Sequence, residues 1–260
     1  MKAWYALAGH RRTAQANRWL GALLAGVAGA INAGGFLAVQ RYTSHMTGIV
    51  SSVADHVALG HTTLALAGLA ALASFTAGAA CTAILVNWGR RRRLHGKYAV
   101  ALMAEAALLL LFGIAGANLQ SFAALLLPST VLLLCFIMGL QNAVTTKISP
   151  AGVRSTHVTG IVTDIGIELG RLLYWNRDAA ANGVHRVGVR REKLATHLAV
   201  LGMFLSGGVA GAFAFATVGF KATLPIAVGL ALLALPPIVA DLRRLGSRRR
   251  RRARRLASVR

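Results

Sequence analysis

Six apolar stretches, each long enough to cross a lipid bilayer, constrain the fold of this chain more than any other feature. An α-helix needs about 20 apolar residues to span ~30 Å of hydrocarbon. Only 14% of the 260 residues are charged, too few to cover a soluble protein of this size. The sequence therefore predicts an all-α, polytopic integral membrane protein. The six stretches are 19–39, 62–88, 98–117, 123–145, 194–218 and 222–240.

The basic residues border these stretches, and they predict the side of the membrane on which each loop lies. The net charge is +22, and loops on the cytoplasmic side are enriched in lysine and arginine. Two further segments, 48–60 and 160–174, are shorter and carry acidic residues. If neither crosses the membrane, the basic clusters at 90–97 and 177–193 and the basic C-terminus all lie in the cytoplasm. We therefore expect a multi-pass protein with cytoplasmic N- and C-termini.

The arginine-rich tail, 242–260, is expected to meet anionic lipid headgroups, at about 1 kcal/mol per basic residue near the surface. Its arginines are not interleaved with aromatic residues for base stacking, so we do not expect nucleic-acid binding. Cys81 and Cys135 both lie in apolar stretches, and their number and spacing indicate neither a disulfide framework nor a metal site. We expect no cofactor. The tail follows an N-terminal cytoplasmic segment, 1–18, and a membrane domain, 19–241.

A short polar motif occurs twice and divides the membrane domain into two halves, 19–117 and 122–241. The motif reads G-x-x-N-A, a loop, and then [ST]-H-x-T-G-I-V-[ST], and its copies occupy residues 29–51 and 139–163. Because polar residues and glycine carry the match, we interpret it as a duplication. Three crossings in each half would place the copies in opposite orientations. Such an inverted repeat is typical of many secondary transporters.

The length of the segment that follows the first motif predicts a re-entrant hairpin. Residues 45–88 would extend ~66 Å as one straight helix, about twice the ~30 Å of hydrocarbon. A break near Gly60 is therefore required, with a short half-helix that starts at Thr47 and returns to the same face. The second copy would do the same from Thr159. Both threonines are expected to cap their helices, and the positive ends of the two helix dipoles would meet near the midplane.

Two groups of residues are candidates for function. Histidine titrates near neutral pH, glycine permits close approach of a solute, and acids inside a membrane are costly and typical of proton pathways. Each residue also has a purely structural alternative. The histidines would tie the hairpins to backbone carbonyls, and the asparagines would form hydrogen bonds between helices. The acids would lie at the level of the lipid headgroups, with Arg171 paired to Glu168. The candidates for substrate binding are His45, Thr47, Gly48, His157, Thr159, Gly160, Asn32 and Asn142, and those for proton coupling are Asp55, Glu105, Asp164 and Glu168.

The second motif copy, with Gly139-Leu140-Gln141-Asn142-Ala143 followed by Thr156-His157-Val158-Thr159-Gly160, resembles the YoaK-like bacterial membrane-protein family, also called domain of unknown function 1275. The resemblance extends over residues 19–240. In that family the first copy usually has an acidic residue near Asn32 and reads Asn-Met-Thr-Gly-Asn, where this chain has His45 and Ile49. The resemblance implies a bacterial plasma-membrane (cell inner membrane) protein, and it implies no activity, substrate or cofactor.

Three classes of function are compatible with these patterns. The leading hypothesis is a small-solute transporter or permeation protein with a midplane site at the two motifs and optional proton coupling. The alternative is a non-transporting scaffold or lipid-interacting protein. We expect no enzyme, since H-E-x-x-H, G-x-S-x-G and phosphate-binding loops are absent from the sequence. The helix dipoles favour a small polar or anionic solute, whereas the acids favour protons or cations. The oligomeric state is left open.

Overall fold

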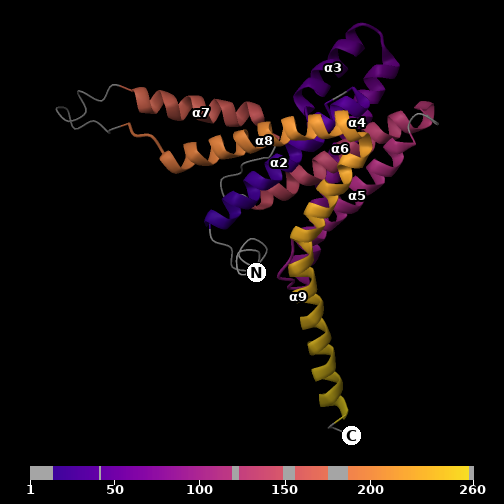
Figure 1. The fold of residues 1–260 in the computed structure, drawn as a ribbon, viewed down its shortest axis with the longest axis vertical. Helices are drawn as coiled ribbons and strands as arrows, with labels where there is room; N and C mark the ends of the chain where they lie inside the picture. Colours follow the sequence, from indigo (N-terminus) through magenta and orange to yellow (C-terminus); the bar gives the residue numbers. More distant parts are fainter. Residues whose placement is uncertain (1–13, 41, 119–122, 149–155, 175–186, 258–260) are drawn as a thin grey trace, which may run out of the picture.

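The computed structural model describes residues 14–40, 42–118, 123–148, 156–174 and 187–257, and every regular element in these ranges is a helix. The all-α prediction is therefore confirmed. Figure 1 shows the helices as a bundle from which α9 extends at one end. The helices are α2 (Ala14–Val39), α3 (Met46–Ala58), α4 (Thr62–Arg91), α5 (Ala99–Ala117), α6 (Ala123–Ile148), α7 (Val158–Leu173), α8 (Arg191–Val218), the 3-10 helix η1 (Gly219–Ala222) and α9 (Thr223–Ala257).

Among the described residues, five stretches are long and apolar enough to cross a membrane, so the chain is a multi-pass membrane protein. The last of them contains both α8 and α9, and the chain turns between them at Gly219, where φ is +60° (Figure 1). Each of these two helices is long enough to cross by itself. The stretches are Gln15–Leu37, Thr62–Arg91, Ala99–Ala117, Leu127–Ile148 and Arg191–Leu245.

The short helices α3 and α7 each form a hairpin with the long helix that follows (Figure 1). The predicted break in the first hairpin is confirmed, because α3 ends at Ala58 and α4 begins at Thr62. Gly60 lies in this turn with φ of +73°, a left-handed conformation that glycine adopts without strain. The break therefore lies where the sequence predicts it, and the re-entrant path of the hairpin stays a prediction.

The predicted threonine caps are wrong. The residues at the N-cap positions of α3 and α7 are His45 and His157, and no side chain caps either helix. A capping side chain must come from the non-helical residue just before the first helical one. Thr47 and Thr159 are the second helical residues of α3 and α7, so they do not occupy that position.

The long helices pair across the two halves of the chain. Helix α2 packs on α8, α4 packs on α6, and α5 packs on α9. Glycines allow the first two pairs to bring their backbones into contact. A β-carbon placed on Gly29 would lie 2.0 Å from the carbonyl oxygen of Phe204, and one placed on Gly139 would lie 2.0 Å from that of Phe75. Each contact joins a motif glycine of one half to a phenylalanine of the other.

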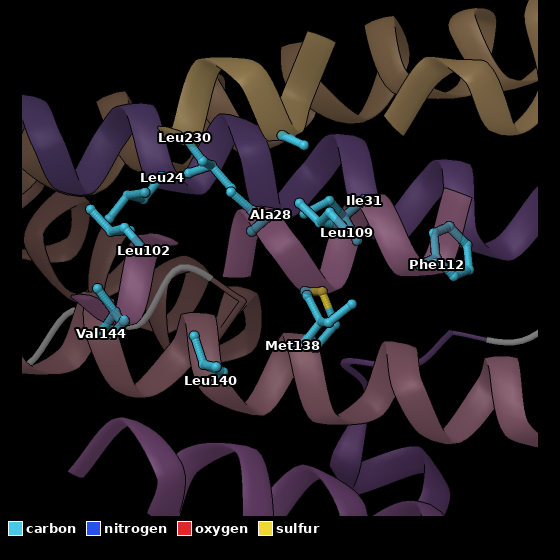
Figure 2. Packing of buried hydrophobic residues seen from close by; sticks show 14 of the residues in the cluster. Leu24, Ala28, Ile31, Leu102, Leu109, Phe112, Met138, Leu140, Val144 and Leu230 are labelled. Atoms are coloured by element: carbon cyan, nitrogen blue, oxygen red, sulfur yellow. The ribbon is translucent and has the colours of Figure 1, made fainter. Parts of the chain in front are cut away.

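The apolar core lies between these paired helices. Figure 2 shows leucine, isoleucine, phenylalanine and methionine side chains from four helices meeting in one cluster. Its labelled members come from α2 (Leu24, Ala28, Ile31), α5 (Leu102, Leu109, Phe112), α6 (Met138, Leu140, Val144) and α9 (Leu230). Because α5 and α6 come from different halves, the core also joins the two halves.

Helix α9 is fixed to the rest of the bundle near its midpoint. The Asp241 carboxylate accepts hydrogen bonds from the backbone N–H groups of His95 and Gly96, both at 2.9 Å. These residues lie between α4 and α5. Beyond Asp241 the helix continues to Ala257, so the expected boundary between membrane domain and tail at residue 242 falls inside one continuous helix (Figure 1).

Candidate functional site

A cavity of about 810 Å³ lies between the two halves, and both motif copies line it. This volume is within the range of small-molecule sites. Helices α4, α6 and α8 complete its wall with Phe75, Lys147 and Phe204 among others. The first copy contributes Asn32, Ser44, His45, Met46 and Thr47, and the second contributes Asn142, Thr156, His157, Val158 and Thr159.

In each copy the asparagine binds the serine or threonine that opens the second part of the motif. Ser44 Oγ donates to Asn32 Oδ1 at 2.7 Å. Asn142 Nδ2 donates to Thr156 Oγ1 at 2.5 Å, and Asn142 Oδ1 accepts from the Thr156 backbone N–H at 3.4 Å. The asparagine therefore ties the start of the short helix to the long helix before it. These bonds lie within one motif copy.

Each motif histidine folds back over the glycine of its own copy. A β-carbon placed on Gly48 would lie 2.2 Å from Cδ2 of His45. One placed on Gly160 would lie 2.4 Å from Cε1 and Nδ1 of His157. The two glycines are therefore not cavity-lining residues. They give space to the two imidazole rings, which do line the cavity.

The N-termini of α3 and α7 both open onto this cavity. The first N–H groups of a helix have no intrahelical acceptor, and no side chain caps these two helices. Each terminus carries the equivalent of about +0.5 charge. Met46 and Thr47 of α3 and Val158 and Thr159 of α7 lie in the wall, so both positive ends lie at one cavity, as the sequence predicts.

The lining residues that sequence reasoning missed include Phe75, Phe204 and Lys147. A signal for the phenylalanines exists, because F-x-x-G occurs in both α4 (Phe75 to Gly78) and α8 (Phe204 to Gly207). Extending the comparison of the two halves beyond the motif would have found it. Lys147 reads as the first charge of a loop, whereas it lies in the last turn of α6 with its side chain at the cavity.

The four acids proposed for proton coupling do not line this cavity. Asp55 is exposed on α3, and Glu105 is fully buried on α5 with neither carboxylate oxygen hydrogen-bonded. Asp164 accepts from Lys193 Nζ at 2.9 Å. Glu168 is fully buried and accepts from Arg171 at 2.8 Å, as its predicted pairing requires, as well as from Arg190. The two acids on α7 therefore form ion pairs with lysine and arginine side chains.

Replacing Glu168 by glutamine is expected to loosen α7 from α8 at neutral pH. The backbone N–H of Arg190 and the guanidinium groups of Arg171 and Arg190 hold the pKa of the Glu168 carboxyl below its usual value. A group with a lowered pKa stabilises the fold above its unfolded value, about 4.3, and this contribution is lost as the pH falls through the folded value. Thermal unfolding in detergent should show a lower melting temperature for Glu168→Gln at pH 7.

The difference in melting temperature between Glu168→Gln and the wild type should shrink as the pH falls below about 4. Glu192→Gln is the matched control, because Glu192 pairs with Arg18 at an exposed surface, and such pairs contribute little. A Glu168→Gln protein with wild-type melting at pH 7 would contradict the assigned role of this carboxylate.

A model of the family described as protein of unknown function DUF1275 matches residues 20–235. The chain belongs to this family. The DUF1275 match includes both motif copies and every helix that lines the cavity, and it ends before the basic half of α9. No curated protein and no solved structure matches the chain.

Proposed function

We propose that this protein moves a small solute across the membrane through the cavity between its two halves. One observation carries the proposal: the two motif copies, far apart in sequence, line one cavity with matching side chains. A scaffold needs no polar cavity shared by its two halves. The wall combines hydroxyl, amide and imidazole groups with two phenylalanine rings, a mixture suited to a small polar ligand.

The proposal includes an inverted repeat of the two halves. Its support is the reciprocal packing, in which the first helix of each half pairs with the second long helix of the other, α2 with α8 and α6 with α4. The last helices of the two halves, α5 in the first and α9 in the second, pack on each other, which fits the same relation. In such proteins broken or short helices meet at a central site, and their N-termini point at the solute. With the basic loops inside, both termini lie in the cytoplasm.

Accessibility of the two motif threonines tests the proposal. In a protein with Cys81→Ala and Cys135→Ala, Thr47→Cys and Thr159→Cys are introduced one at a time. Membrane-impermeant thiol reagents are added outside intact cells and, separately, outside inverted vesicles. Both threonines line the cavity, so each cysteine should react from both sides if the cavity alternates or is continuous between them.

Ser52→Cys provides a matched control, because Ser52 lies on α3 and is exposed but does not line the cavity. It should react from one side or neither. If Thr47→Cys and Thr159→Cys each react from one side only, the cavity is not a path, and the scaffold or lipid-binding alternative is favoured instead.

Transport itself is checked with a double variant, Thr47→Leu with Thr159→Leu. Two leucines would replace two wall hydroxyls with bulkier apolar groups on either side of the cavity. Uptake of a transported solute into proteoliposomes should fall to the level of protein-free liposomes. Uptake unchanged at equal reconstitution would contradict a path through the motifs.

A further inference from the structure

We infer that the solute is a small anion that binds beside Lys147, an inference that rests on the proposed function. Of the described residues in the cavity wall, Lys147 is the one permanent cation, and the imidazoles of His45 and His157 lie in the same wall. Among the described residues that line it, none carries a carboxylate. The wall is therefore electropositive even with both histidines neutral.

The acids that would argue for a cation lie away from the cavity, and two of them form ion pairs with basic side chains. Asp164 is paired with Lys193, and Glu168 with Arg171 and Arg190. Neither lines the cavity, and neither do Asp55 and Glu105. The positions of these groups favour an anion, since the helix N-termini are at the cavity and the four acids are not.

The hydrogen-bonding groups of the wall favour an anion for a separate reason. The amide oxygens of Asn32 and Asn142, which could face a cation, each already accept one hydrogen bond, from Ser44 and from the Thr156 backbone N–H. The cavity also presents several hydrogen-bond donors. They include the first-turn N–H groups of α3 and α7, which no side chain caps, and an imidazole N–H of each motif histidine in any protonation state.

Lys147 makes the contributions of the two halves of the chain to the cavity wall unequal. It lies eight residues after Gly139, and the position eight residues after Gly29 in the first half is Leu37, which does not line the cavity. The Lys147 backbone carbonyl accepts from the Tyr98 hydroxyl at 2.9 Å, which fixes the last turn of α6 to the start of α5. The helix turn that carries Lys147 is therefore held in place at the cavity wall, where the lysine charge attracts anions.

The experiment measures uptake of radiolabelled probes by proteoliposomes held at zero potential with potassium and valinomycin. The probes are phosphate and methanesulfonate as anions, choline as a cation and erythritol as a neutral solute. The wild-type protein should admit at least one anion faster than protein-free liposomes. Lys147→Gln should slow that anion by roughly tenfold, the change that corresponds to about 1.4 kcal/mol.

Two variants make this result specific. Lys147→Arg keeps the charge and should retain most of the wild-type rate. Lys221→Gln removes a lysine from η1, outside the cavity, and should leave the rate unchanged. Anion uptake that is equal in Lys147→Gln and wild type would overturn the role of Lys147.

Failure of this inference differs from failure of the proposed function. Uptake of choline or erythritol that is lost in the Thr47→Leu/Thr159→Leu protein, without uptake of either anion, would overturn the anion assignment and leave the path intact. No uptake of any probe by a protein with normal thermal unfolding would overturn both.

Discussion

Replacing Gly29 by alanine should destabilise the folded protein by about 3 kcal/mol, although alanine is the better helix former. The added β-carbon would lie 2.0 Å from the Phe204 carbonyl oxygen and 2.9 Å from the Gly208 backbone nitrogen. Both contacts are with the backbone of α8, which cannot rotate away as a side chain can. Helices α2 and α8 must therefore separate, and the cavity wall that each contributes must move with them.

Gly21→Ala is the matched control on the same helix. A β-carbon on Gly21 would have no neighbour within 4 Å, so this change should be neutral or stabilise by up to about 1 kcal/mol. Thermal unfolding in detergent, monitored by size-exclusion chromatography, measures the stability change of each variant. Gly139→Ala should repeat the Gly29 result, because its β-carbon would lie 2.0 Å from the Phe75 carbonyl oxygen. Equal melting of Gly29→Ala and Gly21→Ala would show that α2 and α8 do not touch at this point.

Replacing Gly160 by alanine should stop most transport while leaving the fold intact. The new β-carbon would lie 2.4 Å from two atoms of the His157 ring. The ring is the free end of a side chain, so it can rotate away without moving α7. Its place beside the N-terminus of α7 is then lost, and the ring must occupy another part of the cavity. Uptake of the transported anion should fall by roughly tenfold, with melting close to that of the wild type.

Gly166→Ala is the control, since Gly166 lies on the same helix and has nothing within 4 Å of the new carbon. Gly48→Ala should give the same loss through His45, whose Cδ2 would be 2.2 Å away. Normal uptake in both variants would mean that the ring positions do not matter to the path. A large loss of stability instead would mean that the surrounding protein holds the rings in place.

The sequence was sufficient to predict the all-α membrane fold, the break near Gly60 and the meeting of the two motif copies. These predictions rest on strong constraints: an apolar run must span the bilayer, a 44-residue segment cannot do so as one straight helix, and polar groups inside a membrane need partners. The motif side chains His45, Thr47, His157 and Thr159 line one cavity. Their role in binding a substrate stays a prediction.

Features that depend on packing between distant segments could not be predicted. Small residues occur along α2, α4, α6 and α8 alike, so composition does not say that Gly29 contacts Phe204 and Gly139 contacts Phe75. The helix caps depend on the backbone angles of His45, which sequence spacing does not fix. Lys147 reads as a loop charge because only the fold shows that the last turn of α6 borders the cavity.

The reciprocal pairing of helices also sets the order in which the protein can be made. Helix α2 is synthesised long before its partner α8, and α4 before its partner α6. The nascent N-terminal half therefore enters the lipid before the helices that pack against Gly29 of α2 and Phe75 of α4 have been made. Chains usually fold domain by domain during synthesis, but this one must wait for its last two long helices. A ribosome that stops after α5 would release a half-protein for membrane proteases to clear.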